Sequence, residues 1–284
     1  MTTHTSTGTA AHNDDATFRA WGQEMGAILS AIGLVKTANT GQINWTTVLR
    51  PTTSVVAGYE VWRFNDALQA TAPIFLKIEY GTGGASATPR VHVTIGNGTD
   101  GAASVAAGSV VSTRTEVAST GNFSTSVLDR RACAVNGVAW LSYHGGKICF
   151  AVGRAVDAAG APTAEGAWLI TRGTSDTAAT SGQFLRFLSP TFVSAGDSNY
   201  ALVPQSIADS HVGVDVQVFP YFFAQPAIRA TPFGFAIIAS EFTPYTTFSL
   251  TIAGAPRTYI TLPGTAGRGG GSPSAPTAHA MIWE

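Results

Sequence analysis

The sequence predicts a mainly β protein, an antiparallel β-sandwich or barrel-like fold with one α-helix near the N-terminus. Residues 74–80 and 90–95 alternate between apolar and polar side chains, which is the pattern of strands that bury one face. Many short apolar runs follow along the chain at regular spacing, separated by loops rich in Gly, Pro, Ser and Thr. This arrangement is typical of all-β sandwiches and barrels.

Composition limits the classes of function. The chain has 284 residues and 45% hydrophobic content, enough for a substantial core, but only 12% charged residues against a usual ~25%. A net charge of −1 provides no attraction for nucleic acid or anionic lipid, and no apolar run is long enough to span a membrane. A surface poor in charge suits extensive protein–protein contact, although a high-GC genome favouring Ala, Gly and Thr codons explains it equally well.

The first 13 residues are predicted to form a flexible N-terminal arm. They are mostly Thr, Ser, Gly, Ala and His, and they bury too little apolar surface to offset the entropy lost on ordering. The alternative is an arm that becomes ordered only against a neighbouring subunit. No basic region followed by an apolar core occurs here, so a secretory signal is not expected and synthesis in a cytoplasm follows.

Residues 14–36 are predicted to contain the helix. Asp14 or Asp15 can cap its N-terminus, and Gly33 suits the position just beyond its C-terminus, with Leu34 folding back. Apolar side chains recur at steps of three and four positions, as on a helix with one buried face: Phe18, Trp21, Met25, Ile28, Leu29, Ile32 and Val35.

Two glycines in this helix indicate close packing. Gly22 and Gly26 leave one side of the helix flat, although each costs about 1 kcal/mol relative to Ala in a helix interior. The helix can pack on its own sheet, or on copies of itself around a symmetry axis. We expect it to cover the sheet face that carries Ile74–Tyr80, within one subunit or across to the next. The candidate packing residues are Phe18, Trp21, Gly22, Met25, Gly26, Ile28 and Ile32.

Residues 37–284 are predicted to form the β body, and a division into two domains near residues 116–125 is left open. The expected strands, in order, are 40–51, 59–64, 74–80, 90–95, 110–117, 131–135, 138–143, 147–152, 167–172, 184–188, 212–219, 233–239, 247–252, 258–262 and the C-terminal AHAMIWE. The last of these must dock on a sheet, either its own or that of a neighbour.

The strongest hairpin signal is Val138–Val152, where a Gly-Gly pair separates two apolar runs. Asn136–Gly137 predicts a second hairpin directly before it. In the first hairpin Cys149 should face Ser142, well away from Cys133. Both cysteines are therefore predicted to be free, small core residues.

The aromatic triplet Tyr221, Phe222 and Phe223 is a candidate exposed contact. It lies between Pro220 and Pro226, and Pro220 is expected to end the preceding strand, so a loop should follow. An apolar triplet in a loop either plugs into the core or contacts a partner.

No pattern in the sequence is typical of an enzyme. The histidines and cysteines do not occur at metal-ligand spacing, and neither G-x-S-x-G nor a P-loop is present. Residues 96–101 fit G-x-G-x-x-G, but no helical pattern follows them, so they are interpreted as a turn. We therefore expect no catalytic residue, no metal and no cofactor.

Three segments resemble a family of bacteriophage virion proteins: FRAWGQEMGAILSAIGLVKTANTGQINW, GYEVWRFNDALQATAPIFLKIEYGTGG and the closing AMIWE. They are similar to minor or uncharacterised tail proteins encoded among the structural genes of tailed phages. The resemblance covers residues 15–101 and the C-terminus best. It provides no catalytic residue to carry over.

The resemblance implies a self-assembling part of the tail tip, baseplate or fibre attachment region, made in the host cytoplasm and located in the virion, in the tail rather than the head. We expect a homo-oligomer, a trimer or a higher ring, in contact with other virion proteins. One alternative is a tail module that binds a host-surface glycan or protein. Another is a head decoration or head–tail connector protein.

Overall fold

In the computed structural model, the described residues form three antiparallel sheets and one long helix, α1 (Asp15–Ala31). This confirms the mainly β fold class with a single N-terminal helix. The structure describes residues 2–9, 12–84, 88–107, 110–118, 123, 127–143, 145–157, 159–172, 180–186, 201–204, 210–211, 217–224, 228–230, 234–238, 245–252, 255–262 and 278–284.

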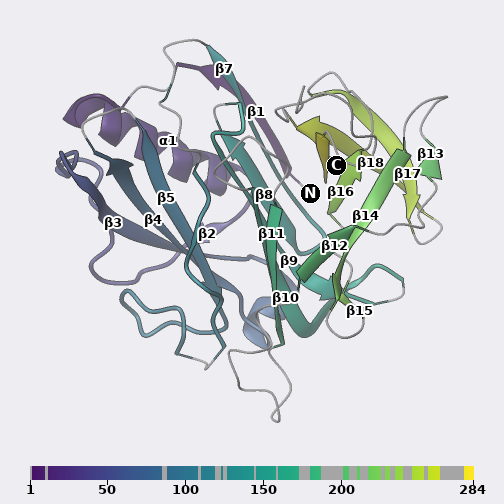
Figure 1. Cartoon of the computed structure of the whole chain (residues 1–284). Helices are drawn as coiled ribbons and strands as arrows, with labels where there is room; N and C mark the ends of the chain where they lie inside the picture. Colours follow the sequence, from purple (N-terminus) through teal and green to yellow (C-terminus); the bar gives the residue numbers. More distant parts are fainter. Residues whose placement is uncertain are drawn as a thin grey trace.

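The sheets are stacked with the central one between the other two (Figure 1). The helix-side sheet has the order β2 (Val35–Lys36), β3 (Ser54–Arg63), β4 (Phe75–Gly83), β5 (Pro89–Gly96), β6 (Thr115–Glu116). The central sheet has the order β1 (Thr2–Gly8), β7 (Leu128–Val135), β8 (Val138–Tyr143), β9 (Ile148–Val156), β10 (Pro162–Arg172), β11 (Thr180–Arg186).

The C-terminal sheet has the order β12 (Ala201–Pro204), β14 (Gln217–Ala224), β16 (Phe235–Ile238), β19 (Ala278–Ile282), β18 (Ala255–Leu262), β17 (Thr247–Ile252). Two short strands, β13 (Ser210–His211) and β15 (Ile228–Ala230), also pair with β14. A short 3₁₀ helix, η1 (Ala67–Ala70), follows β3. The C-terminal strand docks within its own chain, between β16 and β18.

The inner strands of the central sheet bury both of their faces. Ala139, Leu141 and Tyr143 of β8 point into a core shared with α1 and the helix-side sheet. Val138 and Trp140 point into a second core, shared with the C-terminal sheet. The double burial explains why this strand is apolar at nearly every position rather than at alternate ones.

Helix α1 begins and ends as the sequence predicts. The backbone N–H of Thr17 donates to the Asp14 carboxylate at 2.8 Å, and Thr17 completes the capping box. At the C-terminus Gly33 adopts a φ of +93°. The N–H of Leu34 donates to the carbonyl of Leu29 at 3.1 Å, which closes a Schellman motif.

The expected contact between the helix and the sheet face of Ile74–Tyr80 is confirmed, and it lies within one chain. The ring centroids of Trp21 and Tyr80 are 5.7 Å apart, and the apolar face of α1 shares a core with Ile74, Leu76 and Ile78. The helix therefore uses its apolar face inside the subunit.

The two helix glycines have different environments, which predicts opposite effects of alanine. A Cβ at Gly22 would lie 2.1 Å from the Trp45 ring, whereas one at Gly26 would meet Trp62 at an ordinary 3.6 Å. We expect Gly22→Ala to lower the free energy of unfolding by about 1–3 kcal/mol through overpacking. Gly26→Ala, the matched control, should raise it by up to about 1 kcal/mol through helix propensity. Urea denaturation measures both, and equal shifts in the two variants would contradict this packing.

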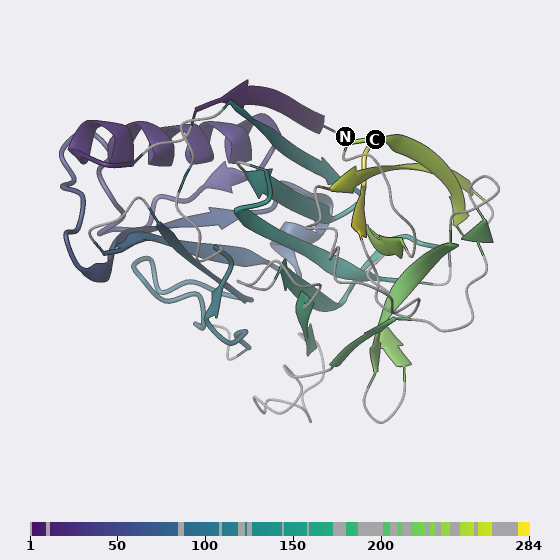
Figure 2. The same cartoon turned by 45° about the horizontal axis from the view of Figure 1, so that its top comes forward.

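Residues 2–8 do not belong to the flexible arm predicted for positions 1–13, because they form strand β1. This strand pairs with β7 from Thr2 opposite Ala134 to Gly8 opposite Leu128. Backbone hydrogen bonds to a neighbouring strand require no apolar pattern in the sequence. Composition alone therefore did not predict strand β1. Figure 2 shows β1 and α1 together along one edge of the molecule.

The strand predicted at residues 40–51 is wrong, since this segment is irregular. Ile43 and Trp45 are apolar because they fill the core, and turns precede Ile43 and begin at Asn44. Gly41 has a φ of +73°, and the Asn44 side chain accepts a hydrogen bond from the N–H of Thr46 in a local turn. Of the strand predicted at 110–117, only β6 forms.

The two predicted hairpins are confirmed. Val135 pairs with Val138 across Asn136–Gly137, where φ is +48° and +72°. In the next hairpin Ser142 lies opposite Cys149, as expected. Both cysteines are buried and free, as predicted.

The loop predicted for Tyr221–Phe223 is wrong, as is the end of the preceding strand at Pro220, because β14 runs through both. Pro220 pairs with Ala236 of β16 on one side. On the other side, pairing with β13 ends at Val218 and pairing with β12 begins at Tyr221. Pro220 therefore occupies a gap in that ladder, where its missing N–H costs little. Residues 212–216 of the predicted strand lie outside the described residues.

The sequence leaves open a division of the β body into two domains near residues 116–125, which is the segment between β6 and β7. The helix-side sheet and the central sheet share one hydrophobic core, which includes Ile78 and Leu141.

In the described part of the chain, no helix has the length and apolar character needed to span a membrane.

Candidate functional site

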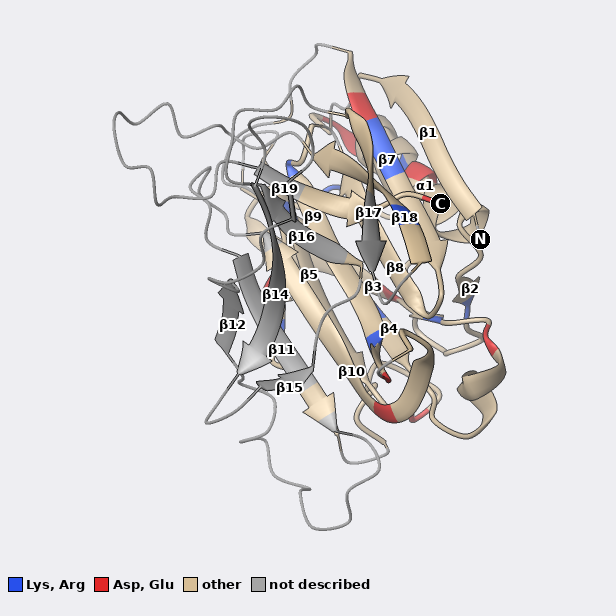
Figure 3. Ribbon diagram, turned by 90° about the vertical axis from the view of Figure 1, so that its right-hand side faces the viewer, with Lys and Arg blue, Asp and Glu red and all other residues tan. Residues whose placement is uncertain are grey.

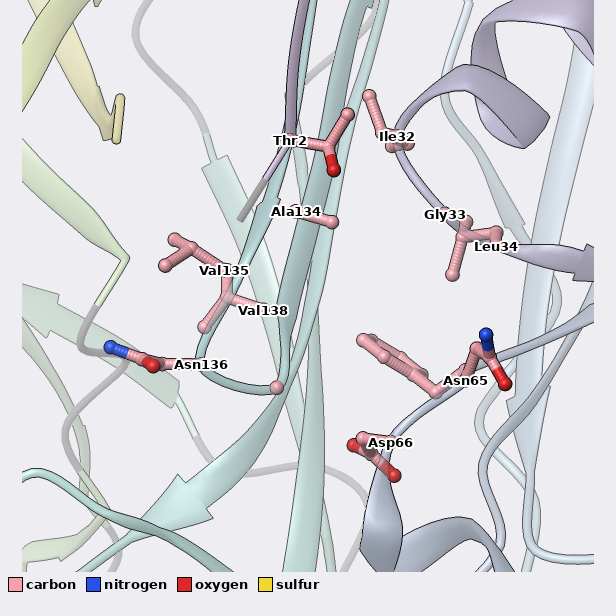
Figure 4. Close-up of a pocket in the computed structure, with 12 residues that line it drawn as sticks. Thr2, Ile32, Gly33, Leu34, Asn65, Asp66, Ala134, Val135, Asn136 and Val138 are labelled. Atoms are coloured by element: carbon pink, nitrogen blue, oxygen red, sulfur yellow. The ribbon is translucent and has the colours of Figure 1, made fainter.

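A pocket of about 330 Å³ lies where three turns meet: the end of α1, the end of β3 and the β7–β8 turn (Figure 4). Its apolar side chains are those of Ile32, Leu34, Phe64 and Ala134. Its volume falls within the range of small-molecule sites, at the lower end. None of these turns is close to another in the sequence.

The polar groups of the pocket come from Thr2, Asn65 and Asp66. In Figure 4 the Thr2 side chain lies across the hollow from Asn65 and Asp66. Together they offer a hydroxyl, an amide and a carboxylate beside the Phe64 ring. Such a set can hydrogen-bond the hydroxyl groups of a small ligand that also has an apolar face.

An ion pair with a buried arginine neutralises the Asp66 carboxylate. Arg154 of β9 donates to Asp66 through Nε at 2.7 Å and Nη2 at 2.8 Å, and through Nη1 to the carbonyl of Ala72 at 2.6 Å. The Arg154 side chain is fully buried, and its guanidinium lies 5.8 Å from the Phe64 ring centroid. The pair carries no net charge, so the pocket favours an uncharged ligand.

The predicted packing residues lie in the interior rather than at a site. Phe18, Trp21, Gly22, Met25, Ile28 and Ile32 are buried, and Gly26 is half-buried. Only Ile32 among them lines the pocket.

The predicted contact triplet lies elsewhere, in β14. Tyr221, Phe222 and Phe223 stand opposite Pro204, Val203 and Leu202 of β12. The orientation of their side chains lies outside what the structure describes.

Sequence reasoning missed a buried carboxylate that accepts four hydrogen bonds. Oε1 of Glu60 accepts from Lys36 Nζ at 2.6 Å and from Trp45 Nε1 at 3.0 Å. Oε2 accepts from Trp62 Nε1 at 3.2 Å and from the Tyr80 hydroxyl at 2.9 Å. Burial, followed by the charge of Glu60, raises the pKa of Tyr80 well above its usual value, so this hydroxyl stays a donor.

A second polar cluster joins α1 to the central sheet. Glu24 of α1 pairs with Nε of the buried Arg130 at 2.8 Å and accepts from the Tyr143 hydroxyl at 2.6 Å. Arg130 also lies 5.0 Å from the Tyr143 ring centroid. Burial, and then the hydrogen bond to Glu24, raise the pKa of Tyr143.

A third cluster lies on the outer face of the helix-side sheet and predicts a pH effect. His92 Nδ1 is 3.1 Å from Arg114 Nη2, and Arg114 also donates to Glu79 at 2.6 Å. Burial, and then the charges of Arg114 and Arg90, lower the pKa of His92 from 6.5 to about 4. Glu79 opposes this shift.

Because the folded state resists protonation of His92, stability should fall as the pH drops. An unfolded histidine takes up its proton near pH 6.5, whereas folded His92 does so only near pH 4. The loss therefore begins near pH 6.5 and is complete near pH 4. Above pH 7, the urea midpoints of the wild type and of His92→Asn should depend on pH in the same way. Between pH 6.5 and 4, only the wild type should show this loss. Identical slopes in both proteins between pH 6.5 and 4 would contradict the assignment.

Within the described part of the chain, no group of three or more His, Cys, Asp or Glu side chains could hold a metal ion. Comparisons with family models, with curated proteins and with solved structures find no significant match to this chain. The resemblance to phage virion proteins therefore stays a prediction.

Proposed function

We propose that this chain is a structural protein of a tailed-phage virion, placed in the tail tip, baseplate or fibre attachment region. It acts by self-assembly and by contacts with other virion proteins, and it is not an enzyme. The placement comes from the resemblance of residues 15–101 and the closing AMIWE. The contacts within the structure support the role of a rigid scaffold.

The observation that carries the scaffold role is the use of buried charge to join layers. Glu24 of α1 binds Arg130 of the central sheet, and Asp66, three residues after the end of β3, binds Arg154 of the central sheet. Glu60 gathers donors from β2, β3, β4 and the irregular segment before β3. The carboxylates of Glu24 and Glu60 serve to hold the fold, whereas a catalytic carboxylate would face a substrate.

The surface also suits a subunit in an assembly. Figure 3 shows few Lys, Arg, Asp and Glu positions along the ribbon, in keeping with 12% charged residues in the whole chain. Charged residues are depleted at the centres of protein–protein interfaces. A body with little charge can therefore bury much of its surface against neighbours at low desolvation cost.

Gold labelling of purified particles tests the placement. An antibody against this chain should label the tail, at its tip or baseplate. Labelling of the head would instead support a decoration or connector protein, and particles that carry no label would contradict a virion role.

A second candidate function, recognition of a host-surface glycan, is favoured by the pocket. A sugar ring has one apolar face that can pack on Phe64, and its hydroxyls can bond to Asp66, Asn65 and Thr2. The neutral Asp66–Arg154 pair suits an uncharged sugar.

Glycan arrays decide this second function. If it holds, Asn65→Ala should weaken binding about tenfold or more, as expected when a bound polar group loses its partner. Asn13→Ala, an exposed asparagine beside the N-cap, is the matched control and should bind like wild type. Binding to no glycan and to no host surface would rule it out.

A further inference from the structure

The N-terminal strand β1 leaves one edge of the central sheet open. Its order begins with β1, whose ladder with β7 is continuous over all seven residues from Thr2 to Gly8. On the opposite edge of β1, every second residue presents an N–H and a C=O with no strand partner in the described part of the chain. This edge can accept one further strand.

Natural proteins usually protect such an edge with lysine, proline, a bulge or an inward charge. Strand β1 has none of these devices, since its sequence is TTHTSTG and its register has no break. Thr3, Thr5 and Thr7 are exposed, and His4 and Ser6 are half-buried on the other face. The open edge is therefore unbroken in register, polar and free of lysine, arginine and carboxylates.

The sequence of β1 is complementary to itself when two copies run antiparallel. With a two-fold axis at Thr5, Thr5 faces Thr5 of the partner subunit and Thr3 faces Thr7 of the partner subunit. On the opposite face, His4 meets Ser6 of the partner subunit. Thr–Thr cross-strand pairs are favourable in antiparallel sheets, and no like charges meet.

We propose that two copies of this chain associate through β1, antiparallel across a two-fold axis at Thr5, so that their central sheets become continuous. The occupant of the edge is thus a second copy. The inference rests on the self-assembly part of the proposed function and not on its placement in a virion. This two-fold contact is distinct from the trimer or ring expected from the sequence, and it can link such units.

The contact area is small, which sets the strength of the association. A seven-residue strand pair buries less than the ~1,200 Å² at the lower limit of stable interfaces. The dimer should therefore dissociate on dilution, and it would depend on the high local concentration that an assembly provides.

Sedimentation velocity over a range of concentrations tests the proposal, with the full chain carrying no N-terminal tag. The wild type should shift from monomer to dimer as the concentration rises. Thr5→Lys and Thr5→Glu each place two like charges opposite each other at the axis, which should weaken association about tenfold or more. Thr52→Lys, an exposed threonine outside β1, is the matched control and should dimerise like wild type.

A mixture of Thr5→Lys and Thr5→Glu should recover dimers, because the two changes then face each other as opposite charges. Recovery separates the two-fold pairing from a folding defect, and equal melting temperatures of all variants check that β1 still pairs with β7. A monomeric wild type at every concentration, or Thr5→Lys that dimerises like wild type, would overturn the inference. Neither result would bear on whether the chain is present in virions.

Discussion

Replacing Glu60 by alanine is expected to lower the free energy of unfolding by about 3–5 kcal/mol, as when one partner of a buried charge network is removed. The change leaves three buried donors without an acceptor, on Trp45, Trp62 and Tyr80. Each unsatisfied buried donor costs about 1–3 kcal/mol. Lys36 contributes less, because its side chain is 38% exposed and can reach water.

Two further variants separate the network from the mere loss of a carboxylate. Glu60→Gln keeps the shape and one acceptor oxygen, so it should cost less than Glu60→Ala. Glu165→Ala removes an exposed glutamate and should change stability by no more than about 0.5 kcal/mol. Guanidinium unfolding followed by tryptophan fluorescence measures all three. A Glu60→Ala protein as stable as Glu165→Ala would refute the structural role of this carboxylate.

Replacing Trp140 by alanine is expected to cost a similar 3–5 kcal/mol, the usual range for a buried aromatic residue. Trp140 is 1% exposed in the core between the central and C-terminal sheets, and its Nε1 donates to the carbonyl of Ile282 at 2.7 Å. Its ring centroid lies 5.7 Å from that of Trp283. The side chain therefore attaches the C-terminal strand β19 to the central sheet.

The smaller change Trp140→Phe tests the two parts of that contact. It keeps an aromatic ring in the core but removes the hydrogen bond to Ile282, so it should lower the free energy of unfolding clearly less than Trp140→Ala. Trp283→Ala, on a half-buried neighbour, should also cost less. Denaturation curves provide all three values, and a loss below about 1 kcal/mol for Trp140→Ala would contradict the docking.

The sequence predicted those parts of the fold that local chemistry decides. Alternation over residues 74–80 identified β4, and Asp14 and Gly33 marked the two ends of α1. The turn at Asn136–Gly137 needs positive φ at both positions, which these residue types allow. The sheet face that α1 covers was predicted correctly, because the apolar face of the helix and that of residues 74–80 are the nearest to each other in the sequence.

The parts that were missed depend on contacts between distant residues. Strand β1 is ordered by the edge of β7, which lies more than a hundred positions away. Ile43 and Trp45 carried the apolar signal of a strand, but they fill the core from an irregular segment. Pro220 lies inside β14 because one side of that strand has a gap there, which no local pattern reveals.

The candidate site could not be predicted, because its pocket forms only when three separate turns meet. For Glu60 a signal did exist. The run Tyr59–Phe64 is apolar on both faces, and Glu60 shares the inner face with Trp62. A carboxylate at such a position must have buried donors, and indole N–H groups are donors only. The Lys36, Trp45 and Tyr80 partners, however, come from other segments.

Quantitative mass spectrometry of purified phage particles tests the proposed virion role most directly. We expect this chain to be present in a fixed number of copies per particle, in constant ratio to the other tail proteins after repeated purification. Absence of the chain from particles, with all of it in the soluble lysate of infected cells, would contradict the proposed virion role.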